Sequence, residues 1–256
     1  MGNGTPLSSG ALGHLCRIED VPRRTSMIEP FCTSWQPGVP QAKGLVSGVP
    51  STRDREYKLP ITVMNHLTVD GVMQGPGRAD EDTRGGFRDG GWAEAGNDEV
   101  MSRFMGERMA RGGGALLLGR RTYGDLLSFW NTQPDSPFTP VLNDLPKYVA
   151  STTLTEPLPW PNSRLLQGDA ADAVAMLKRE QPDTSFTIMG SRILIQSLMT
   201  SDLIDEWLLM THPLVLRTGM RLFGEGGPTM RLSLIDSVTT TTGVVIGTYR
   251  PADRPL

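Results

Sequence analysis

Residues 118–124 are Leu-Gly-Arg-Arg-Thr-Tyr-Gly, and this stretch decides how the sequence folds. The apolar run Ala-Leu-Leu-Leu at 115–118 precedes it and is typical of a strand covered on both faces. Glycine lets a backbone approach a ligand, while arginines and the first amides of a helix favour a phosphate group. We therefore expect a buried strand that leads through an anion-binding turn into a helix. Taken alone, the stretch is equally compatible with a solvated basic turn.

A second strand-to-helix junction has a similar pattern. Residues 188–194 are Ile-Met-Gly-Ser-Arg-Ile-Leu, in which Gly190 opens a turn and Ser191 precedes the next helix as its N-cap. Ligands of open α/β sheets bind outside the carboxyl ends of the strands, so both helix starts can converge on one pyrophosphate. Neither junction has the G-x-G-x-x-G pattern of the Rossmann fold or the G-x-x-x-x-G-K-S/T pattern of a P-loop. The sequence therefore requires a different nucleotide-binding fold.

The segments around these junctions alternate between strand and helix. The expected strands are residues 59–68, 115–118, 147–150, 164–166, 185–189 and 206–216. The expected helices are one that has Asn97 as its N-cap and runs to Met109, residues 170–179 and 192–199, and one that follows residue 119. Residues 231–240 and 244–250 are rich in threonine and valine and predict an antiparallel hairpin around Thr242-Gly243. The order predicts an α/β fold with a central, mixed, mostly parallel sheet, helices on both faces and a C-terminal antiparallel hairpin.

The first 58 residues differ in composition from the rest of the chain. They are rich in Gly, Pro, Ser and Thr and show no sustained period of 2 or 3.6. Such a segment cannot bury enough apolar area to offset its ordering entropy. We expect residues 1–58 to be a disordered or loosely attached extension and residues 59–256 to form one domain. Within it, the polar, glycine-rich residues 75–91 predict a long loop beside a binding site.

Composition limits the partners and the location of the chain. With 38% hydrophobic residues and a formal net charge of −3, the 256 residues can form a core but have no basic field for nucleic acid. No apolar run approaches the roughly 18 to 20 residues of a membrane helix, and the first residues lack the pattern of a secretory signal. Cys16 and Cys32, with His14, match no metal-ligand spacing. We expect no metal, no nucleic-acid or membrane partner, and a reducing, cytoplasmic location.

Five motifs in one order give the sequence a family resemblance. They are Thr68-Val69-Asp70-Gly71, residues 118–123, Val149-Ala150-Ser151-Thr152, Met189-Gly190-Ser191, and the run from Leu203 to Phe223. Together they cover most of residues 59–225 and resemble the dihydrofolate reductase superfamily, in particular the branch that contains the reductase domain of riboflavin biosynthesis. The resemblance implies a dihydrofolate reductase-like fold with NADPH bound along the carboxyl edge of the sheet.

The resemblance also implies which residues bind the cofactor. At the two junctions and the strand between them, these are Gly119, Arg120, Arg121, Thr122, Ser151, Gly190, Ser191 and Arg192. Ser151 corresponds to a position beside the adenosine 2′-phosphate, and with Arg120 it favours NADPH over NADH, because a phosphate dianion needs cationic and hydroxyl donors. The family usually has a second glycine where this chain has Ser191.

Two carboxylates are candidates for a proton donor. Asp70 matches the acidic residue that follows the first strand in the family, although it is equally suited to forming the turn. Dihydrofolate reductases also place a carboxylate early in the first helix, after a tryptophan. Here Trp92 is followed by Glu94, Asp98 and Glu99, of which we take Asp98 as the candidate; a solvated helix start is the alternative for each. Because this spacing departs from that of dihydrofolate reductases, we do not expect dihydrofolate to be the substrate.

The sequence thus predicts an NADPH-dependent reductase that transfers a hydride to a small heterocycle of the pteridine, pyrimidine or flavin-pathway type. The cofactor performs the hydride transfer, so a general acid is needed only where the product gains a proton. Two alternatives remain: a non-catalytic nucleotide-binding or sensing module of the same fold, and a structural dimer whose site has decayed. The resemblance implies that the chain can form a homodimer, for example through residues 207–216.

Overall fold

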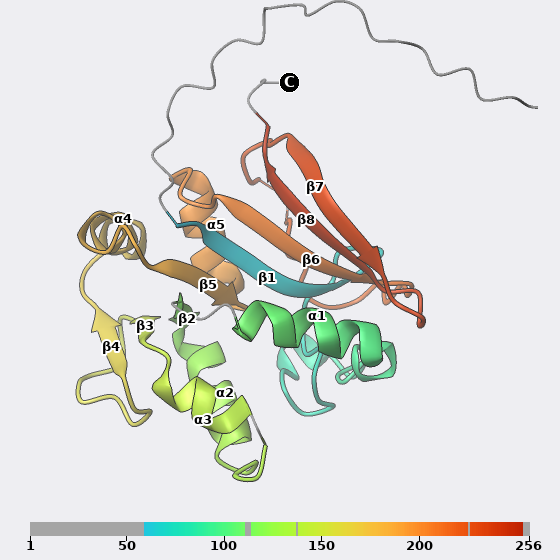
Figure 1. Ribbon diagram of the computed structural model, residues 1–256, viewed down its shortest axis with the longest axis horizontal. Helices are drawn as coiled ribbons and strands as arrows, with labels where there is room; N and C mark the ends of the chain where they lie inside the picture. Colours follow the sequence, from blue (N-terminus) through green and yellow to red (C-terminus); the bar gives the residue numbers. More distant parts are fainter. Residues whose placement is uncertain (1–58, 111–113, 137, 225, 253–256) are drawn as a thin grey trace, which may run out of the picture. The chain divides into compact units, whose positions relative to one another are not determined.

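The structure of the protein is a computed structural model that describes residues 59–110, 114–136, 138–224 and 226–252. The expected extension, residues 1–58, lies outside the described residues, so its character stays a prediction. The described chain forms an eight-stranded sheet with helices on both faces (Figure 1). None of the described helices is long and apolar enough to cross a membrane.

The elements follow the predicted alternation. In chain order they are β1 (Ile61–Thr68), the short turns η1 (Arg84–Gly86) and η2 (Glu94–Gly96), α1 (Glu99–Ala110), β2 (Gly114–Gly119), α2 (Arg120–Trp130), α3 (Phe138–Asp144), β3 (Lys147–Ala150), β4 (Ser163–Leu166), α4 (Ala170–Glu180), β5 (Ser185–Met189), α5 (Arg192–Thr200), β6 (Glu206–His212), β7 (Leu232–Thr239) and β8 (Val245–Pro251). The strand order is β4-β3-β2-β5-β1-β6-β8-β7. The strands from β4 to β6 are parallel, while β8 and β7 are antiparallel. The predicted mixed, mostly parallel sheet with a C-terminal hairpin is confirmed.

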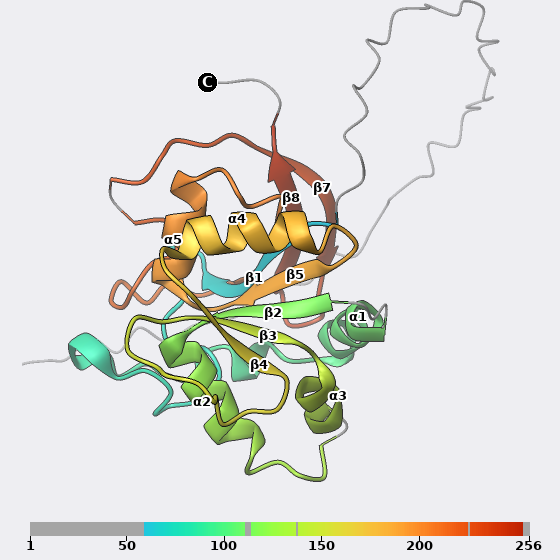
Figure 2. The same ribbon diagram turned by 90° about the vertical axis from the view of Figure 1, so that its left-hand side faces the viewer.

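Side chains that alternate along the central strands build a core on each face of the sheet. Helices α4 and α5 lie on one face, and α1, α2 and α3 lie on the other (Figure 2). Trp207 and Leu209 of β6 point into the α4–α5 layer, whereas Leu208 and Met210 pack with Met101 of α1. Because β1, β2, β5 and β6 are covered on both faces, they are apolar along most of their length.

Three local features differ from the sequence prediction. Strand β6 ends at His212 instead of continuing to residue 216, because Pro213 has no N–H to donate and the Leu214 amide donates to the His212 carbonyl at 2.7 Å. Helix α1 begins after Asp98, whose Oδ1 accepts the Met101 amide at 2.8 Å, so the N-cap is Asp98 and not Asn97. Helix α3, residues 138–144, was not predicted.

A buried carboxylate joins α1 to the antiparallel part of the sheet. Glu206, at the start of β6, is 6% exposed. Its Oε1 accepts a hydrogen bond from Arg108 Nη2 at 2.9 Å, and its Oε2 accepts one from Arg250 Nη2 at 3.1 Å. A buried carboxylate is tolerated only when it is paired, so the two arginines stabilise Glu206 in this place.

We expect Arg108→Ala to lower the free energy of unfolding by about 2 kcal/mol, because it leaves the buried carboxylate with a single cationic partner. Urea unfolding followed by circular dichroism measures this loss. Arg103→Ala is the matched control: it removes an exposed arginine of the same helix, whose ion pair with Glu99 lies in solvent. Equal effects of the two changes would contradict the role given to Glu206.

Candidate functional site

Three parallel strands, β3, β2 and β5, end side by side at one edge of the sheet, and β1 runs past the end of β5. The register pairs Gly119 of β2 with Ala150 of β3, and Met64 of β1 with Met189 of β5. The residues that follow these positions therefore meet at the same edge, in the order β3, β2, β5, β1. This arrangement brings together both predicted junctions and Ser151, which come from three separate parts of the sequence.

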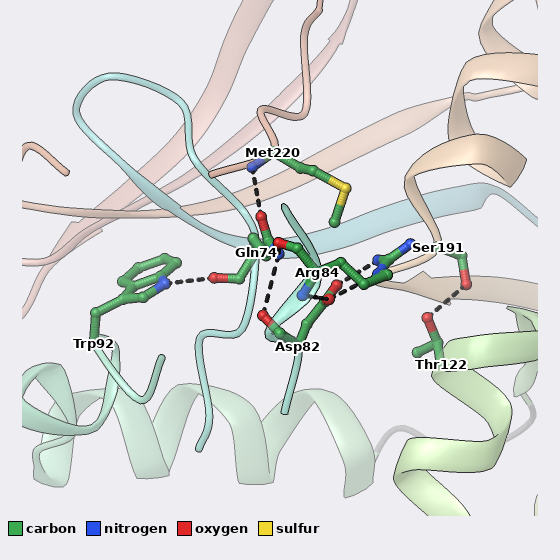
Figure 3. A network of polar contacts seen from close by, with 7 residues as sticks. All are labelled: Gln74, Asp82, Arg84, Trp92, Thr122, Ser191 and Met220. Carbon is green, nitrogen blue, oxygen red and sulfur yellow. Dashed lines mark hydrogen bonds and ion pairs between the residues drawn. The ribbon is translucent and has the colours of Figure 1, made fainter. Parts of the chain in front are cut away.

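The hydroxyl of Ser191 ties the two junctions to each other. Its Oγ accepts the N–H of Gly119 at 2.7 Å and donates to Thr122 Oγ1 at 3.0 Å, the second of which Figure 3 shows. Gly190 and Ser191 both have left-handed backbones, with φ of 62° and 63°. A Cβ at Gly119 would lie 3.1 Å from Ser191 Oγ, so glycine at that position allows the close approach. The amide of Gly119 is bonded to Ser191 and is therefore not a free donor for a ligand. The missing side chain of Gly119 allows the two junctions to lie close together.

The starts of α2 and α5 keep features that suit an anion. No side chain among the described residues caps either helix. Arg120 and Arg121, in the first turn of α2, are exposed, and neither forms an ion pair with any described residue. Uncapped helix amides together with unpaired guanidinium groups can bind phosphate oxygens.

The other two predicted phosphate-binding residues already have partners. Arg192 Nε donates to the Arg221 carbonyl at 2.9 Å, which leaves its remaining N–H groups for a ligand. Ser151 Oγ accepts the amides of Thr153 and Leu154 at 3.1 and 3.0 Å and so begins the turn after β3. Because its oxygen already accepts two amides, the Ser151 side chain would bind an anion by donating its hydroxyl proton.

Asn65 was missed by the sequence analysis. It is a residue of β1, and its side chain joins this strand to the second junction. Its Oδ1 accepts the N–H of Gly190 at 2.8 Å and thereby supports the left-handed turn. Its Nδ2 is buried and has no hydrogen-bond partner within the described residues. A buried unpaired donor is rare in proteins and is costly unless a ligand or water satisfies it.

A histidine pair lies beyond Asn65 and was also missed. His66 Nδ1 is 2.8 Å from His212 Nε2, and the two rings are tilted by 46°. Burial, and then the proximity of His212, lower the pKa of His66 to about 4, and burial also lowers the pKa of His212. Both imidazoles are therefore neutral near pH 7. The signal that was overlooked is the polar pair Asn65-His66 inside an otherwise apolar strand.

The predicted loop, residues 75–91, is organised by Gln74. The buried Gln74 side chain donates to the carbonyls of Asp82 and Arg84 at 3.1 and 3.0 Å and accepts the amide of Met220 at 2.9 Å. Trp92 Nε1 donates to the Gln74 carbonyl at 2.7 Å (Figure 3). This network fixes Trp92, whose ring meets His212 edge to face at 5.3 Å.

The same loop is held against α2, next to the first junction. Arg78 Nη2 lies 2.5 Å from Asp125 Oδ1, and the Arg78 guanidinium stands 5.0 Å from the centre of the Phe129 ring. Ion pairing and cation–π attraction therefore both favour this position of the loop. The loop accordingly lies beside the candidate site, as its composition predicted.

The two predicted proton donors both have structural hydrogen bonds. Asp70 accepts from Thr68 Oγ1 at 2.6 Å and from the amide of Arg217 at 2.9 Å, and these bonds, that of Thr68 first, hold its pKa well below the usual range. Asp98 caps α1 and accepts the amide and hydroxyl of Thr241, each at 2.7 Å; the bonds from Met101 and Thr241 lower its pKa. Both carboxylates thus stay ionised near neutral pH, and a role in catalysis stays a prediction.

The described residues contain no group of three or more His, Cys, Asp or Glu placed to hold a metal ion. His14, Cys16 and Cys32, which the sequence analysis considered as ligands, lie outside the described residues. The candidate site is therefore built from the two junctions, Asn65 and the histidine pair.

Comparison with known proteins agrees with this geometry. The family described as the RibD C-terminal domain matches residues 60–246. A protein from Shewanella sp. PV-4 assigned to riboflavin biosynthesis has a similar structure, with a TM-score of 0.54 and 24% identity over 76% of this chain and 99% of that one. A pyrimidine reductase-like protein from Corynebacterium diphtheriae gives a TM-score of 0.50 and 11% identity over 76% of this chain and 93% of that one. At these identities the two structures show the fold alone, and no curated protein matches the sequence.

We expect Ser191→Ala to lower the free energy of unfolding by about 2 kcal/mol, because the Gly119 amide loses its acceptor in a partly buried place. Thermal and urea unfolding measure the loss. Ser128→Ala, on the exposed side of α2, is the control and should change stability by less than about 0.5 kcal/mol. A Ser191→Ala protein as stable as this control would show that the hydroxyl does not join the junctions.

We expect stability to fall between about pH 6.5 and pH 4 because of His66. The unfolded chain binds a proton at His66 in this range and the folded chain does not, so protonation favours unfolding as the pH falls. The loss is complete near the folded pKa and amounts to at most about 3 kcal/mol. Urea unfolding at pH 7 and pH 5 tests this in wild type and His66→Gln. His14→Gln is the control, since it removes the histidine outside the described residues. The same pH dependence in His66→Gln as in wild type would refute the assignment.

Proposed function

Because this chain belongs to the family of the RibD C-terminal domain, we propose that it is an NADPH-dependent reductase that transfers a hydride to a small heterocycle. One observation carries the proposal: the Ser191 hydroxyl joins two uncapped helix starts, one of which bears two unpaired arginines, at the carboxyl edge of the sheet. A diphosphate needs convergent amide and guanidinium donors, and this edge supplies both.

The residues present fit a dinucleotide in three respects. The junctions offer donors for the diphosphate, the glycines permit close backbone approach, and the unpaired Nδ2 of Asn65 is a donor that still needs an acceptor. Bound NADPH would supply the hydride, while the protein would bind and orient the cofactor and the substrate. Gly119 would contribute by its lack of a side chain, since its amide is already bonded to Ser191.

A preference for NADPH over NADH follows from the neighbouring strands β2 and β3. Because Gly119 pairs with Ala150, Arg120 and Ser151 follow directly at the ends of adjacent strands. A guanidinium and a hydroxyl donor are the groups that stabilise a 2′-phosphate dianion. NADH lacks this phosphate and would leave both donors without a partner.

The heterocycle would lie at the β1 end of the edge. Met64 and His66 of β1, with Thr187 and Met189 of β5, are partly exposed on strands that are otherwise buried. A substrate of the pteridine, pyrimidine or flavin-pathway type suits such a surface, since flat rings bind apolar walls through their faces and polar groups through their edges. The names of the similar proteins, in riboflavin biosynthesis and pyrimidine reduction, support the same classes.

Two further parts of the proposal concern the remainder of the chain. Residues 59–256 would form the reductase domain, with residues 1–58 as a separable extension. Residues 207–212 belong to β6, which is buried between β1 and β8, so a homodimer would form instead through the edge strand β7, on which Leu234 and Ile235 are each about half exposed. An apolar edge strand exposed in this way is a ready surface for pairing with a second copy.

A non-catalytic nucleotide-binding module is the second candidate function. It is favoured by one observation, namely that both predicted proton donors are held ionised by structural hydrogen bonds. Binding of NADPH without turnover of any heterocycle would support this candidate.

We expect micromolar binding of NADPH, at least tenfold weaker binding of NADH, and a loss of about tenfold or more in NADPH affinity in Arg120→Ala, which is the effect of losing one charge-assisted contact. Quenching of protein fluorescence and enhanced nicotinamide emission measure the binding. Arg103→Ala removes an exposed arginine of α1 and should bind like wild type. Absence of binding of either cofactor to wild type would refute the proposed function.

A further inference from the structure

The hydrogen bond between His66 and His212 leaves one N–H of His66 without a partner. Nδ1 of His66 is bonded to His212, while its Nε2 forms no hydrogen bond with any described residue. The side chain is partly exposed even though β1 lies between β5 and β6 in the middle of the sheet. A ligand can therefore reach His66 only from the face of the sheet that carries α1 and α2.

The surroundings of His212 determine which atoms carry the protons. Within the described residues the ring of His212 has His66 as its hydrogen-bond partner, and Nδ1 lies against Gly96, where an added Cβ would be 2.5 Å away. A proton on Nδ1 would have no acceptor among the described residues, whereas a proton on Nε2 is donated to His66. His212 therefore carries its proton on Nε2 and donates it to His66 Nδ1. A neutral His66 then carries its own proton on Nε2.

The pair is also held rigidly. Trp92 meets His212 edge to face, and Trp92 is itself fixed by the hydrogen bond from Nε1 to the Gln74 carbonyl. On the other side Gly96 packs against the His212 ring so closely that no larger residue fits without movement. The hydrogen bond to the fixed ring of His212 holds the His66 ring in one orientation, as a preorganised binding site requires.

The place of His66 follows from the proposed function, on which this inference rests. The diphosphate donors lie at the ends of β2 and β5, and Asn65 of β1 bonds to the Gly190 amide. His66 is the next residue along β1, and its side chain points to the opposite face of the strand from Asn65. A dinucleotide that extends from β2 across β5 would bring its reacting ring to β1, beside His66.

We propose that His66 donates a hydrogen bond from Nε2 to an uncharged heterocycle that carries a carbonyl oxygen or ring nitrogen, and that His212 is the positioning residue that fixes this donor. No carboxylate or cation contacts either imidazole within the described residues, and the low pKa of His66 keeps it neutral. A neutral N–H donor suits a neutral acceptor, such as a pteridine or pyrimidine carbonyl, and provides no charge for a carboxylate or phosphate.

Imidazole NMR of the full chain tests the proposal, because the sequence has only three histidines to assign, His14, His66 and His212. We expect long-range proton–nitrogen spectra to show His66 and His212 with their protons on Nε2. NADPH alone should shift the His66 ring resonances and leave those of His14 in place. Lumazine, a neutral pteridine-dione, added to the complex with NADP⁺ should move the His66 Nε2–H proton downfield.

Variants separate a hydrogen-bonding role from a structural one. His66→Phe should weaken lumazine binding to the complex with NADP⁺ about tenfold, which is the effect of one lost hydrogen bond. His66→Gln keeps an N–H donor and should bind lumazine within about threefold of wild type. His212→Phe should leave His66 present but convert its spectrum to a mixture of the two tautomers. The wild-type spectra decide the matter even if a variant does not fold.

The outcomes distinguish this inference from the proposed function. If wild type does not bind NADPH, both fall together. If NADPH binds and the His66 resonances do not move, the placement of His66 is wrong and the proposed function stands. If His66 responds to NADPH but lumazine does not bind, or binds equally well to His66→Phe, the assigned hydrogen bond is wrong.

Discussion

The Ser191 hydroxyl makes the contact on which the arrangement of the candidate site depends. It bonds to the Gly119 amide and to Thr122 at once, and so links the end of β2, the start of α2 and the start of α5. Ser191 can do this because Gly190 and Ser191 both adopt left-handed backbones, which turn the chain sharply at the end of β5. That conformation is unfavourable for serine by roughly 1 kcal/mol, so the two hydrogen bonds that it permits are what retain it. The serine in place of a second glycine is therefore a bridge between the junctions.

From this bridge the site extends in two directions with different chemistry. Toward β3 it offers exposed arginines and helix amides, which suit phosphate groups. Toward β1 it offers a neutral histidine pair beside Trp92, which suits an uncharged ring. The edge of the sheet is therefore positive at its β3 end and neutral at its β1 end. A molecule that carries a charged diphosphate and a neutral ring matches this order. The loop around Gln74 keeps Trp92 in place at the neutral end.

The parts of the fold that were predictable depend on local signals. A glycine between an apolar run and an amphipathic segment marks both junctions, so Gly119 and Gly190 could be placed from the sequence. The end of β6 and the cap of α1 were misplaced by a few residues, because the missing N–H of Pro213 and the hydrogen bond from the Met101 amide to Asp98 are local features that the periodic pattern does not reveal. The polar pair Asn65-His66 marked one of the two histidines, but their pairing was not predictable, since His66 and His212 are 146 residues apart and meet only when β1 pairs with β6. Family resemblance supplied the roles of the junctions, but it gave none for Asn65 or His66.

A crystal structure of the protein with bound NADP⁺ tests the central claim most directly. The account predicts the diphosphate within hydrogen-bonding distance of the first amides of both α2 and α5, the 2′-phosphate beside Arg120 and Ser151, and the nicotinamide at the β1 end next to His66. A cofactor bound elsewhere on the domain, or bound at this edge with its nicotinamide at β3, would contradict the account.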